Sequence, residues 1–342
     1  DNKADGAEVL QGGGGLYFSE AAVRMERCTF VSNEAVYGGA YFGAVADVVD
    51  CAFTNNVAET VHNGQPAFGG AVYTTEGVTN VFRRTAFVDN DATSGAKSWC
   101  YGGAISAEGG RTAVDTCVFD YGGKQNAKAY GNAIDFNAVD VSLLNSTFRR
   151  GKVEAISAYN SPIAMTNCVV VGNGSSGDIY IEGDTLVSMA YSAYGKCQVQ
   201  DPAKVTGVFN LSGRTTDIYD GESLRLDGSD FNPVAGLGFR QPGVTDFADT
   251  AYGSRPYGFS MGAFETNTLP RVVNACATRE YDGTTSSNGC DWTGWRLTDL
   301  DFQDASFPEL VPEGDVDYAL RQAFAVTNWV FGTEANGGAV GH

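Results

Sequence analysis

Short apolar segments of alternating polarity recur along the first half of the chain. Most of them end in a phenylalanine that is followed three residues later by asparagine or glycine, and a Gly-Gly-Ala block comes next. Alternation with a period of two is typical of β-strands that bury one face. The copies of the first motif are Cys28–Asn33, Cys51–Asn56, Thr85–Asn90, Cys117–Gly122, Ser146–Gly151 and Cys168–Asn173, and those of the second are Gly38–Ala40, Gly69–Ala71, Gly102–Ala104, Gly131–Ala133 and Val153–Ala155.

One position of the first motif is always asparagine or glycine. Both residues tolerate a left-handed backbone at low cost, so we expect a turn with positive φ there in every repeat. Each rung alone cannot bury its apolar face and must stack on its neighbours. The expected turn ladder consists of Asn33, Asn56, Asn90, Gly122, Gly151 and Asn173.

This pattern predicts an all-β chain that winds as a right-handed, single-stranded parallel β-helix. In this prediction residues 1–266 form the β-helix, with regular repeats over about 12–183 and irregular rungs over 184–266. Residues 267–342 form a loop-rich extension that caps the coil. It carries one amphipathic α-helix over about 315–331, where Asp315 can cap the first turn and Gly332 follows the last.

The paired motifs resemble the repeats of the chlamydial polymorphic outer membrane proteins and related surface β-helices of the pectate-lyase-like superfamily. The resemblance covers about residues 12–183, and the stretch from Asp246 to Glu265 is similar to the segment that ends many extracellular β-helices. The resemblance implies a secreted or surface-displayed scaffold, often adhesive. It implies no particular chemistry, because β-helices include both lyases and inert stalks.

The variation in repeat length is confined to one side of the coil. Gaps from the Gly-Gly-Ala alanine to the next Cys, Thr or Ser are 11 to 14 residues, whereas the return gaps range from 9 to 20. We therefore expect residues 57–68, 91–101 and 121–130 to stack as loops along one flank, where solenoids often build binding sites. Their candidate ligand-binding residues are His62, Lys97, Trp99, Tyr101, Tyr121, Lys124, Lys128 and Tyr130.

Aromatic rings with a few cations suit a carbohydrate or protein surface. The alternative is that these loops only tolerate extra length, with Trp99 covering the edge of the coil.

The charge balance narrows the range of partners. The chain has 41 acidic and 22 basic residues, a formal net charge of −19. A surface this negative repels phosphate backbones, which argues against nucleic acid. Two histidines exclude a histidine-rich metal site, and no apolar stretch is long enough to span a membrane. We expect no metal and no cofactor.

The sequence assigns no catalytic residue. Lys124 and Lys128 could supply the base of a lyase, but the basic residues do not converge on one groove in this register. A hydrolase needs two carboxylates on neighbouring rungs as acid and base. Asp115, Asp135 and Asp140 are the candidates, and we expect all three to be solvated on the outer face.

Eight cysteines in an acidic chain favour an oxidising, extracellular setting over free thiols in the cytosol. Cys28 and Cys51 hold the same position on consecutive rungs, about 4.8 Å apart, which permits a disulfide. Cys276 and Cys290 are the other expected pair and close a polar loop. The pairing of Cys100, Cys117, Cys168 and Cys197 is left open, although an intervening rung separates Cys117 from Cys168.

Asn-x-Ser/Thr sequons fit the same setting. Asn145 is an expected glycosylation site because strand alternation points it outward, and Asn210 is the other. Asn173 is a weaker candidate, because we expect its side chain to be bonded inside the turn ladder.

Together these features predict a non-catalytic structural or adhesive module of a larger extracellular glycoprotein. Its expected partners are other extracellular proteins or copies of itself, with glycan as a further ligand of the stacked loops. An open first rung would expose unpaired strand edges, so we expect more chain or a partner before Asp1. The alternatives are a polysaccharide lyase or glycoside hydrolase of the pectate-lyase-like fold, and a passive spacer.

Overall fold

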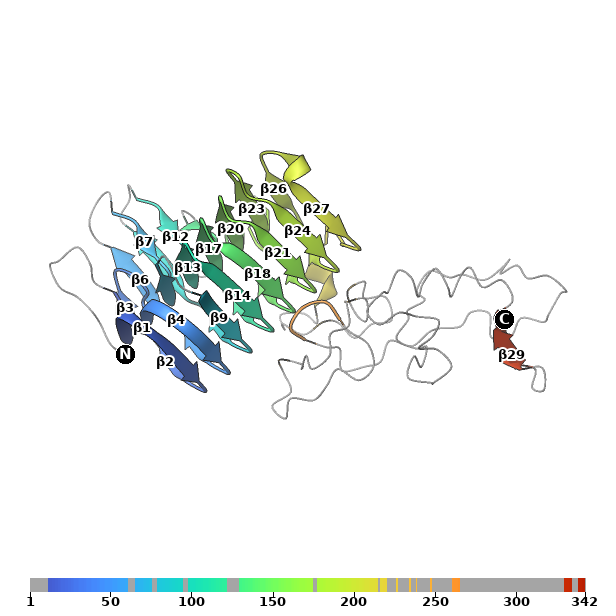
Figure 1. The fold of residues 1–342 in the computed structure, drawn as a ribbon, viewed down its shortest axis with the longest axis horizontal. Coiled ribbons are helices and arrows are strands. Elements are labelled where there is room, and N and C mark those ends of the chain that lie inside the picture. The colour runs from blue at the N-terminus through green and yellow to red at the C-terminus, as the bar shows by residue number, and fades with distance from the viewer. Residues whose placement is uncertain are drawn as a thin grey trace.

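A computed structural model describes residues 12–60, 65–75, 79–94, 98–121, 129–174, 177–214, 216–219, 226, 234, 238, 247, 260–264, 329–333 and 338–341. Over residues 12–211 the described chain is a stack of short parallel strands that winds rung upon rung (Figure 1). The expected all-β fold with stacked parallel strands is therefore confirmed.

The largest sheet has 14 strands, because the long strands β1 (Leu16–Glu26) and β4 (Tyr41–Val49) join two arms. One arm contains β8 (Val72–Thr74), β13 (Ile105–Glu108), β17 (Ile134–Asn137), β20 (Ile156–Tyr159), β23 (Ile179–Glu182) and β26 (Cys197–Val199). The other arm contains β9 (Thr79–Arg83), β14 (Arg111–Asp115), β18 (Asp140–Leu144), β21 (Ile163–Thr166), β24 (Val187–Ala190) and β27 (Val205–Val208).

Three smaller parallel sheets form the remaining sides of the coil. A seven-stranded sheet contains β2 (Thr29–Val31), β5 (Ala52–Thr54), β10 (Ala86–Val88), β15 (Val118–Asp120), β19 (Thr147–Arg149), β22 (Val169–Val170) and β25 (Ala193–Tyr194). Two three-stranded sheets contain β3 (Glu34–Ala35), β6 (Val57–Thr60) and β11 (Asp91–Ser94), and β7 (Ala67–Phe68), β12 (Cys100–Tyr101) and β16 (Ala129–Tyr130). The short 3-10 helices are η1 (Pro202–Lys204) and η2 (Thr216–Ile218).

Equivalent residues of successive rungs lie on top of one another and fill the interior. The clearest column is aromatic, with successive ring centroids 4.6 to 5.0 Å apart and ring planes within 8° of parallel. Its members are Phe30, Phe53, Phe87, Phe119 and Phe148. The last four are fully buried. This column confirms that repeat positions stack, because the same motif residue supplies every ring.

The asparagines of the expected turn ladder also stack, and their side chains bond from rung to rung. The backbone and side-chain amides of Asn33 donate to Oδ1 of Asn56 (3.0 and 2.8 Å), and those of Asn56 donate to Oδ1 of Asn90 (3.0 and 2.9 Å). The side chain of Asn56 also donates to the carbonyl of Phe30, and that of Asn90 to the carbonyl of Phe53. Asparagine is therefore used here for a buried hydrogen-bond ladder.

Positive φ was expected at the ladder residues themselves, and this expectation is wrong by one residue. Positive φ angles belong to the preceding positions, Ser32 (54°), Asn55 (53°), Asp89 (52°), Arg150 (65°) and Gly172 (79°). Where the ladder residue is asparagine, its side-chain bonds select it, while the left-handed corner before it accepts ordinary residues at a cost of about 1 kcal/mol each. Gly122 lies outside the described residues, and the amide of Gly151 donates to Oδ1 of Asn173 (3.1 Å).

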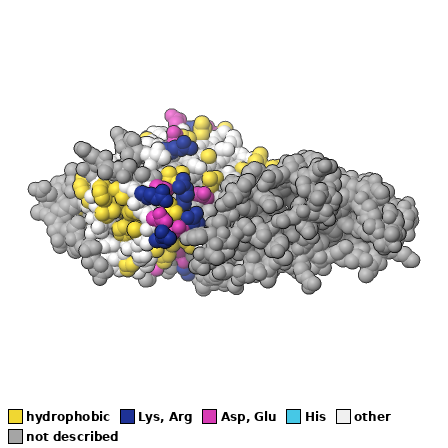
Figure 2. All heavy atoms as spheres, turned by 60° about the horizontal axis from the view of Figure 1, so that its bottom comes forward, with side chains coloured by type: hydrophobic (Ala, Val, Ile, Leu, Met, Phe, Trp, Pro, Cys, Tyr) yellow, Lys and Arg dark blue, Asp and Glu magenta, His cyan; other side chains and the backbone are white. Residues whose placement is uncertain are grey.

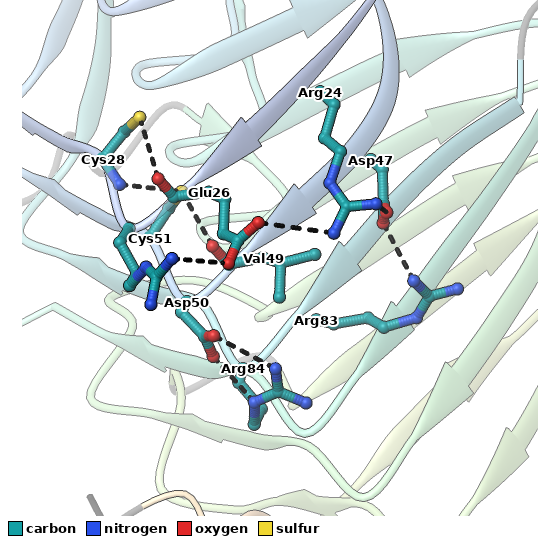
Figure 3. Close-up of polar contacts among 10 residues, drawn as sticks. Arg24, Glu26, Cys28, Asp47, Val49, Asp50, Cys51, Arg83 and Arg84 are labelled. Carbon is teal, nitrogen blue, oxygen red and sulfur yellow. Dashed lines mark hydrogen bonds and ion pairs between the residues drawn. The ribbon is translucent and has the colours of Figure 1, made fainter.

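Figure 2 shows Lys and Arg side chains interleaved with Asp and Glu on one face of the described chain, beside an area of hydrophobic side chains. Ion pairs between successive rungs join Arg83 to Asp47 (2.9 Å) and Arg84 to Asp50 (2.7 Å) (Figure 3). Exposed pairs of this kind contribute about 0–1 kcal/mol each. The arginines of this edge thus neutralise neighbouring acids and do not form a purely basic patch.

A second ladder runs along the position of Cys28 and Cys51. Each ladder side chain donates to the carbonyl two residues earlier, as Cys51 does to Val49 (3.2 Å; Figure 3) and Ser146 does to Leu144 (2.7 Å). In three rungs the backbone amide also donates to the ladder side chain of the next rung. The members that share the first bond are Cys28, Cys51, Thr85, Cys117, Ser146, Cys168 and Ser192.

Cys28 and Cys51 occupy adjacent rungs as expected, but both are free thiols, so the disulfide expected between them is wrong. The physical reason is that cysteine replaces serine or threonine at a hydrogen-bonding position. Cys100, Cys117, Cys168 and Cys197 are also free thiols. None of these six described cysteines forms a disulfide, and Cys276 and Cys290 lie outside the described residues.

Backbone bonds to the preceding rung continue to Gly213 and Arg214, and described residues farther along the chain cover a sheet from outside. The amide of Gly262 donates to the carbonyl of Asn167 (2.6 Å), and the amide of Ala263 donates to Oγ1 of Thr147 (2.9 Å). Tyr219 lies under the guanidinium of Arg149 at 4.2 Å. The described residues from 216 to 264 thus pack beside earlier strands, and among them we find no further rung of the kind expected up to residue 266.

The expected C-terminal extension lies largely outside the described residues, which include neither Cys276, Cys290 nor residues 315–328. Residues 329–331, the end of the expected α-helix, belong instead to strand β28 (Trp329–Thr333), which pairs antiparallel with β29 (Gly338–Gly341).

Asn145 is buried, which corrects the expectation that it points outward. It has φ of 47°, its side-chain amide donates to Asp115 (3.0 Å), and its Oδ1 accepts from Asn167 (3.1 Å). The left-handed corner interrupts the strand alternation on which the expectation rested. Asn210 is half-buried and accepts from the Ser192 amide, and the side chain of Asn173 is bonded inside the coil as expected.

Candidate binding site at the glycine corner

The expected flank exists, because the strands of the inserted segments pair with one another. β6 pairs with β11, and β12 pairs with both β7 and β16. Trp99, Tyr101 and Tyr130 lie on this flank. His62, Lys97, Lys124 and Lys128 lie outside the described residues.

Tyr121 does not belong to the binding surface. It is 1% exposed and packs in the main hydrophobic core, so its expected role as a ligand-binding residue is wrong. It follows strand β15, whose three residues are all buried, and burial raises the pKa of its phenol well above the ordinary value.

A column of aromatic rings borders the corner where the chain passes from the second three-stranded sheet to the largest sheet. Successive ring centroids of Tyr37, Phe68, Tyr101 and Tyr130 are 5.8, 5.1 and 5.7 Å apart. Each of these residues directly precedes a glycine with φ between 60° and 64°. We call this edge the glycine corner, defined by Gly38, Gly69, Gly102 and Gly131.

Glycine is required at this corner by both conformation and space. At Gly102, φ is +64° and a Cβ atom would lie 2.0 Å from the carbonyl oxygen of Ile105. No larger residue fits without moving the backbone of the next strand. The sharp turn brings the aromatic column close to the outward face of the following strands.

A second outward column faces the first across the corner. Strand pairing aligns Phe42, Tyr73, Ser106, Asp135, Ser157 and Tyr180 on successive rungs. The rings of the two columns approach each other, with Phe68 5.2 Å from Tyr73 and Tyr130 6.2 Å from Tyr180. The aromatic column and the outward column therefore meet along a line parallel to the coil axis.

Carboxyl groups collect along the same line. Burial raises the pKa of Asp135 to about 7; the Ser157 hydroxyl lowers this pKa, and nearby Glu108 and Glu154 raise it. Burial also raises the pKa of Glu154, whose Oε1 accepts weakly from the Gly131 amide (3.4 Å). Asp135 is thus only about half ionised near neutral pH, which corrects the expectation that it is solvated. Asp140 is exposed and Asp115 half-buried.

The nearby acids also raise the pKa values of the corner tyrosines. Burial raises the pKa of Tyr130, and the carboxylates of Glu182, Glu154 and Asp135 raise it further. Burial also raises the pKa of Tyr101, and the nearby carboxyl of Asp135 raises it further. The phenols stay neutral and can donate hydrogen bonds, while the four acids form one connected electrostatic group. We call Glu108, Asp135, Glu154 and Glu182 the acid cluster.

Solvent reaches the corner unevenly. Rings in the column Tyr37–Tyr130 cover one another's faces and present edges and hydroxyls, whereas Trp99 is 53% exposed and tilts against Tyr130 at 5.1 Å. The corner therefore offers one open aromatic face, a row of ring edges, and carboxyl oxygens beside them.

A separate shallow groove of about 670 Å³ lies on the other arm of the large sheet. It runs over strands β14, β18, β21, β24 and β27, and Arg111, Asp140, Leu186 and Lys204 are among its lining residues. Lys204 is engaged by Asp184 (3.0 Å) and by the carbonyl of Gly183 (2.8 Å). The groove brings together no comparable set of perturbed groups.

Three of the expected ligand-binding residues, Trp99, Tyr101 and Tyr130, lie at the corner, and its other members were not expected there. Phe68 and Tyr37 carry a signal that could have found them, since an aromatic residue directly precedes the first glycine in four successive blocks. Asp135 and Glu154 carry no such signal, because their burial depends on rings supplied from other rungs.

Within the described residues no three His, Cys, Asp or Glu side chains are placed to hold a metal ion. Nor does that part of the chain contain a helix long and apolar enough to cross a membrane.

No protein-family model, curated protein or solved structure matches this chain. The comparisons thus give no support to the resemblance to polymorphic outer membrane proteins, while the stacked parallel sheets stand on the strand pairing itself.

Proposed function

We propose that this chain is an adhesive β-solenoid that binds an extended glycan along the glycine corner. The observation that carries the proposal is the alignment of an aromatic column and the acid cluster along one line parallel to the coil axis. Rungs repeat at about 4.8 Å, a spacing close to the length of one sugar residue in a β-linked chain. Neighbouring sugars could therefore meet equivalent groups on neighbouring rungs.

The chemistry of the corner suits sugars better than an apolar ligand. Carboxylates accept hydrogen bonds from sugar hydroxyls, phenols donate them, and the open face of Trp99 can stack on the C–H face of a ring. The polar rows also contain more hydrogen-bonding groups than a purely hydrophobic docking surface needs.

The wider setting is part of the same proposal. The repeat motifs and the acidic composition support a right-handed coil, a relation to the pectate-lyase-like surface proteins and an extracellular location as parts of this proposal. The sequon supports glycosylation at Asn210, whose side-chain amide must first release the carbonyl of Met189. A structural role with other extracellular proteins or further copies as partners fits the solenoid form.

Calorimetric titration with neutral β-linked hexasaccharides tests the binding function. We expect Trp99→Ala to weaken binding about tenfold, the effect of losing one stacking contact of 1–2 kcal/mol. Phe209→Ala is the matched control, because Phe209 is an exposed aromatic residue at the far end of the coil. Absence of binding by the wild type, or equal loss in both variants, would overturn the proposal.

A second candidate function, glycoside hydrolysis, is favoured by Asp135 alone. A carboxyl that holds a proton near pH 7 can protonate a leaving glycosidic oxygen, and a neighbouring carboxylate, Glu154 or Glu108, can take a proton from the attacking water. Incubation with the same oligosaccharides should then release new reducing ends, and Asp135→Asn should stop the release. Intact oligosaccharides after prolonged incubation would reject hydrolysis and leave the binding function standing.

A further inference from the structure

We infer that the glycine corner selects glycans that carry protonated amino groups, such as a deacetylated amino-sugar polymer. The inference rests on the proposed glycan binding and names the class of glycan. It is drawn from the placement of the acid cluster and of one buried hydroxyl that lacks a partner.

The acid cluster spreads along the corner and does not converge on a point. Glu108 is on β13, Asp135 on β17, Glu154 two residues before β20, and Glu182 on β23. These four successive rungs span about 14 Å at about 4.8 Å per step. A compact metal ion would need its ligands gathered at one place, and the described residues contain no such group. A chain with repeated charges matches this spacing better.

Among the described residues, the groups that face Asp135 do not balance the charges of the cluster. Those groups are Tyr101 from β12, Tyr130 from β16, Glu108 from β13, Glu154, and Ser157 from β20. The ionisable ones in this described set are all acids or phenols. A ligand that brings positive charge gains attraction from several carboxylates at once, and it offsets the cost of ionising Asp135.

Ser106 supplies an independent sign of a missing partner. Its side chain is 1% exposed, lies between Tyr73 and Asp135 in the outward column, and its Oγ makes no hydrogen bond. A buried hydroxyl without a partner has lost its hydrogen bonds to water and destabilises the fold. An ammonium group donates three hydrogen bonds and could serve Asp135 and Ser106 together.

The test compares two hexamers of the same sugar, glucosamine and N-acetylglucosamine, by titration of the full chain just below neutral pH. We expect the amino form to bind at least about tenfold more tightly, which corresponds to one charge-assisted hydrogen bond. High salt should weaken this preference, because it is electrostatic.

Variants assign the preference to the cluster. Asp135→Asn and Glu108→Gln should each reduce the preference several-fold, whereas Asp140→Asn, an exposed acid on β18, should leave it unchanged. Substitution of the buried Asp135 carries the risk of a folding defect. Glu108 is partly exposed, so Glu108→Gln tests the cluster without that risk. A preference that survives both cluster variants would overturn the inference.

The remaining outcomes separate this inference from the function on which it rests. Equal or tighter binding of the acetylated hexamer would overturn the amino-sugar inference and leave glycan binding intact. Binding of neither hexamer, nor of the neutral hexasaccharides, would overturn both. Tighter binding of a lysine hexamer than of either sugar would also overturn both and would favour a basic peptide as the ligand.

Discussion

The asparagine ladder and the glycine corner are two edges of the same coil, and they treat polar groups in opposite ways. At the asparagine ladder, the bonds between Asn33, Asn56 and Asn90 satisfy buried amides from rung to rung. At the glycine corner, Asp135 and Glu154 are buried among other acids, and Ser106 has no hydrogen-bond partner. The bonds of the asparagine ladder stabilise the coil, whereas the buried acids of the glycine corner destabilise it electrostatically.

Within one repeat, the asparagine ladder serves folding, whereas the glycine corner is the candidate binding site. The bonds between Asn33, Asn56 and Asn90 recur because they satisfy buried amides of neighbouring rungs and so support folding. Unsatisfied groups at a corner do not help the coil to fold, so a ligand is the simplest reason to retain them. Substitutions at the two edges, and in the core between them, should therefore have different effects on stability.

The largest expected effect is in the core that both edges enclose. Phe87→Ala removes a fully buried ring from the middle of the phenylalanine column and should lower the free energy of unfolding by about 3–5 kcal/mol. Denaturant titration measures this change. Val88→Ala, the next residue on the outward face, should cost far less. Equal losses would show that the column does not form the core.

At the glycine corner, Asp135→Asn should stabilise the protein above pH 7. The pKa of Asp135 is about 7 in the folded state and about 4 when unfolded, so the folded state holds more protons between these values. Ionisation therefore costs stability as pH rises from about 4 to 7, up to about 4 kcal/mol above pH 7. The asparagine variant lacks this penalty.

Unfolding curves at several pH values give the difference between variant and wild type. It should vanish near pH 4 and reach its plateau above pH 7. Asp140→Asn, at an exposed position on the neighbouring arm, should show no such trend. A variant that is less stable than the wild type at pH 8 would mean that Asp135 is satisfied within the fold.

The asparagine ladder should respond in the opposite direction. Asn56→Gly removes the acceptor of two Asn33 amides and the donor to Phe30, at a cost of about 2–3 kcal/mol. Asn55→Gly should be neutral or stabilising, because Asn55 holds the left-handed conformation that glycine prefers. If the two variants exchanged these effects, the ladder would be a conformational turn and not a hydrogen-bond network.

The smallest effect is expected at the cysteine ladder. Cys51→Ser should change the free energy of unfolding by about 1 kcal/mol or less, because serine makes the same bonds at Ser146 and Ser192. Cys51→Val should cost more, because the Cys28 amide loses its acceptor. A loss of about 2–4 kcal/mol in Cys51→Ser, sensitive to reducing agent, would instead indicate a disulfide.

Much of the coil could be predicted from sequence because its determinants are local and repeated. Phenylalanines three residues before an Asn or Gly recur often enough to predict their stacking, and Phe30, Phe53 and Phe87 do stack. The site was only partly predictable. Trp99, Tyr101 and Tyr130 are visible in the variable segments, whereas Asp135 looks like any outward acid until the rings beside it are known.

Two errors have the same physical origin. Positive φ was expected at Asn33 because asparagine tolerates it, and a disulfide was expected between Cys28 and Cys51 because their spacing permits one. In both cases the side chain instead hydrogen-bonds to a backbone group or to the next rung. Residue type alone does not distinguish between these uses of the same side chain.

The local motifs are enough to predict that the first half of this chain is a stack of equivalent turns, because each repeat carries its own strand, corner and ladder residue. Which acids lose their water, and that the Ser106 hydroxyl lacks a partner, depends on contacts between repeats. Burial of Asp135 and Ser106 is the sum of contributions from four strands and two sheets, and no single repeat encodes it.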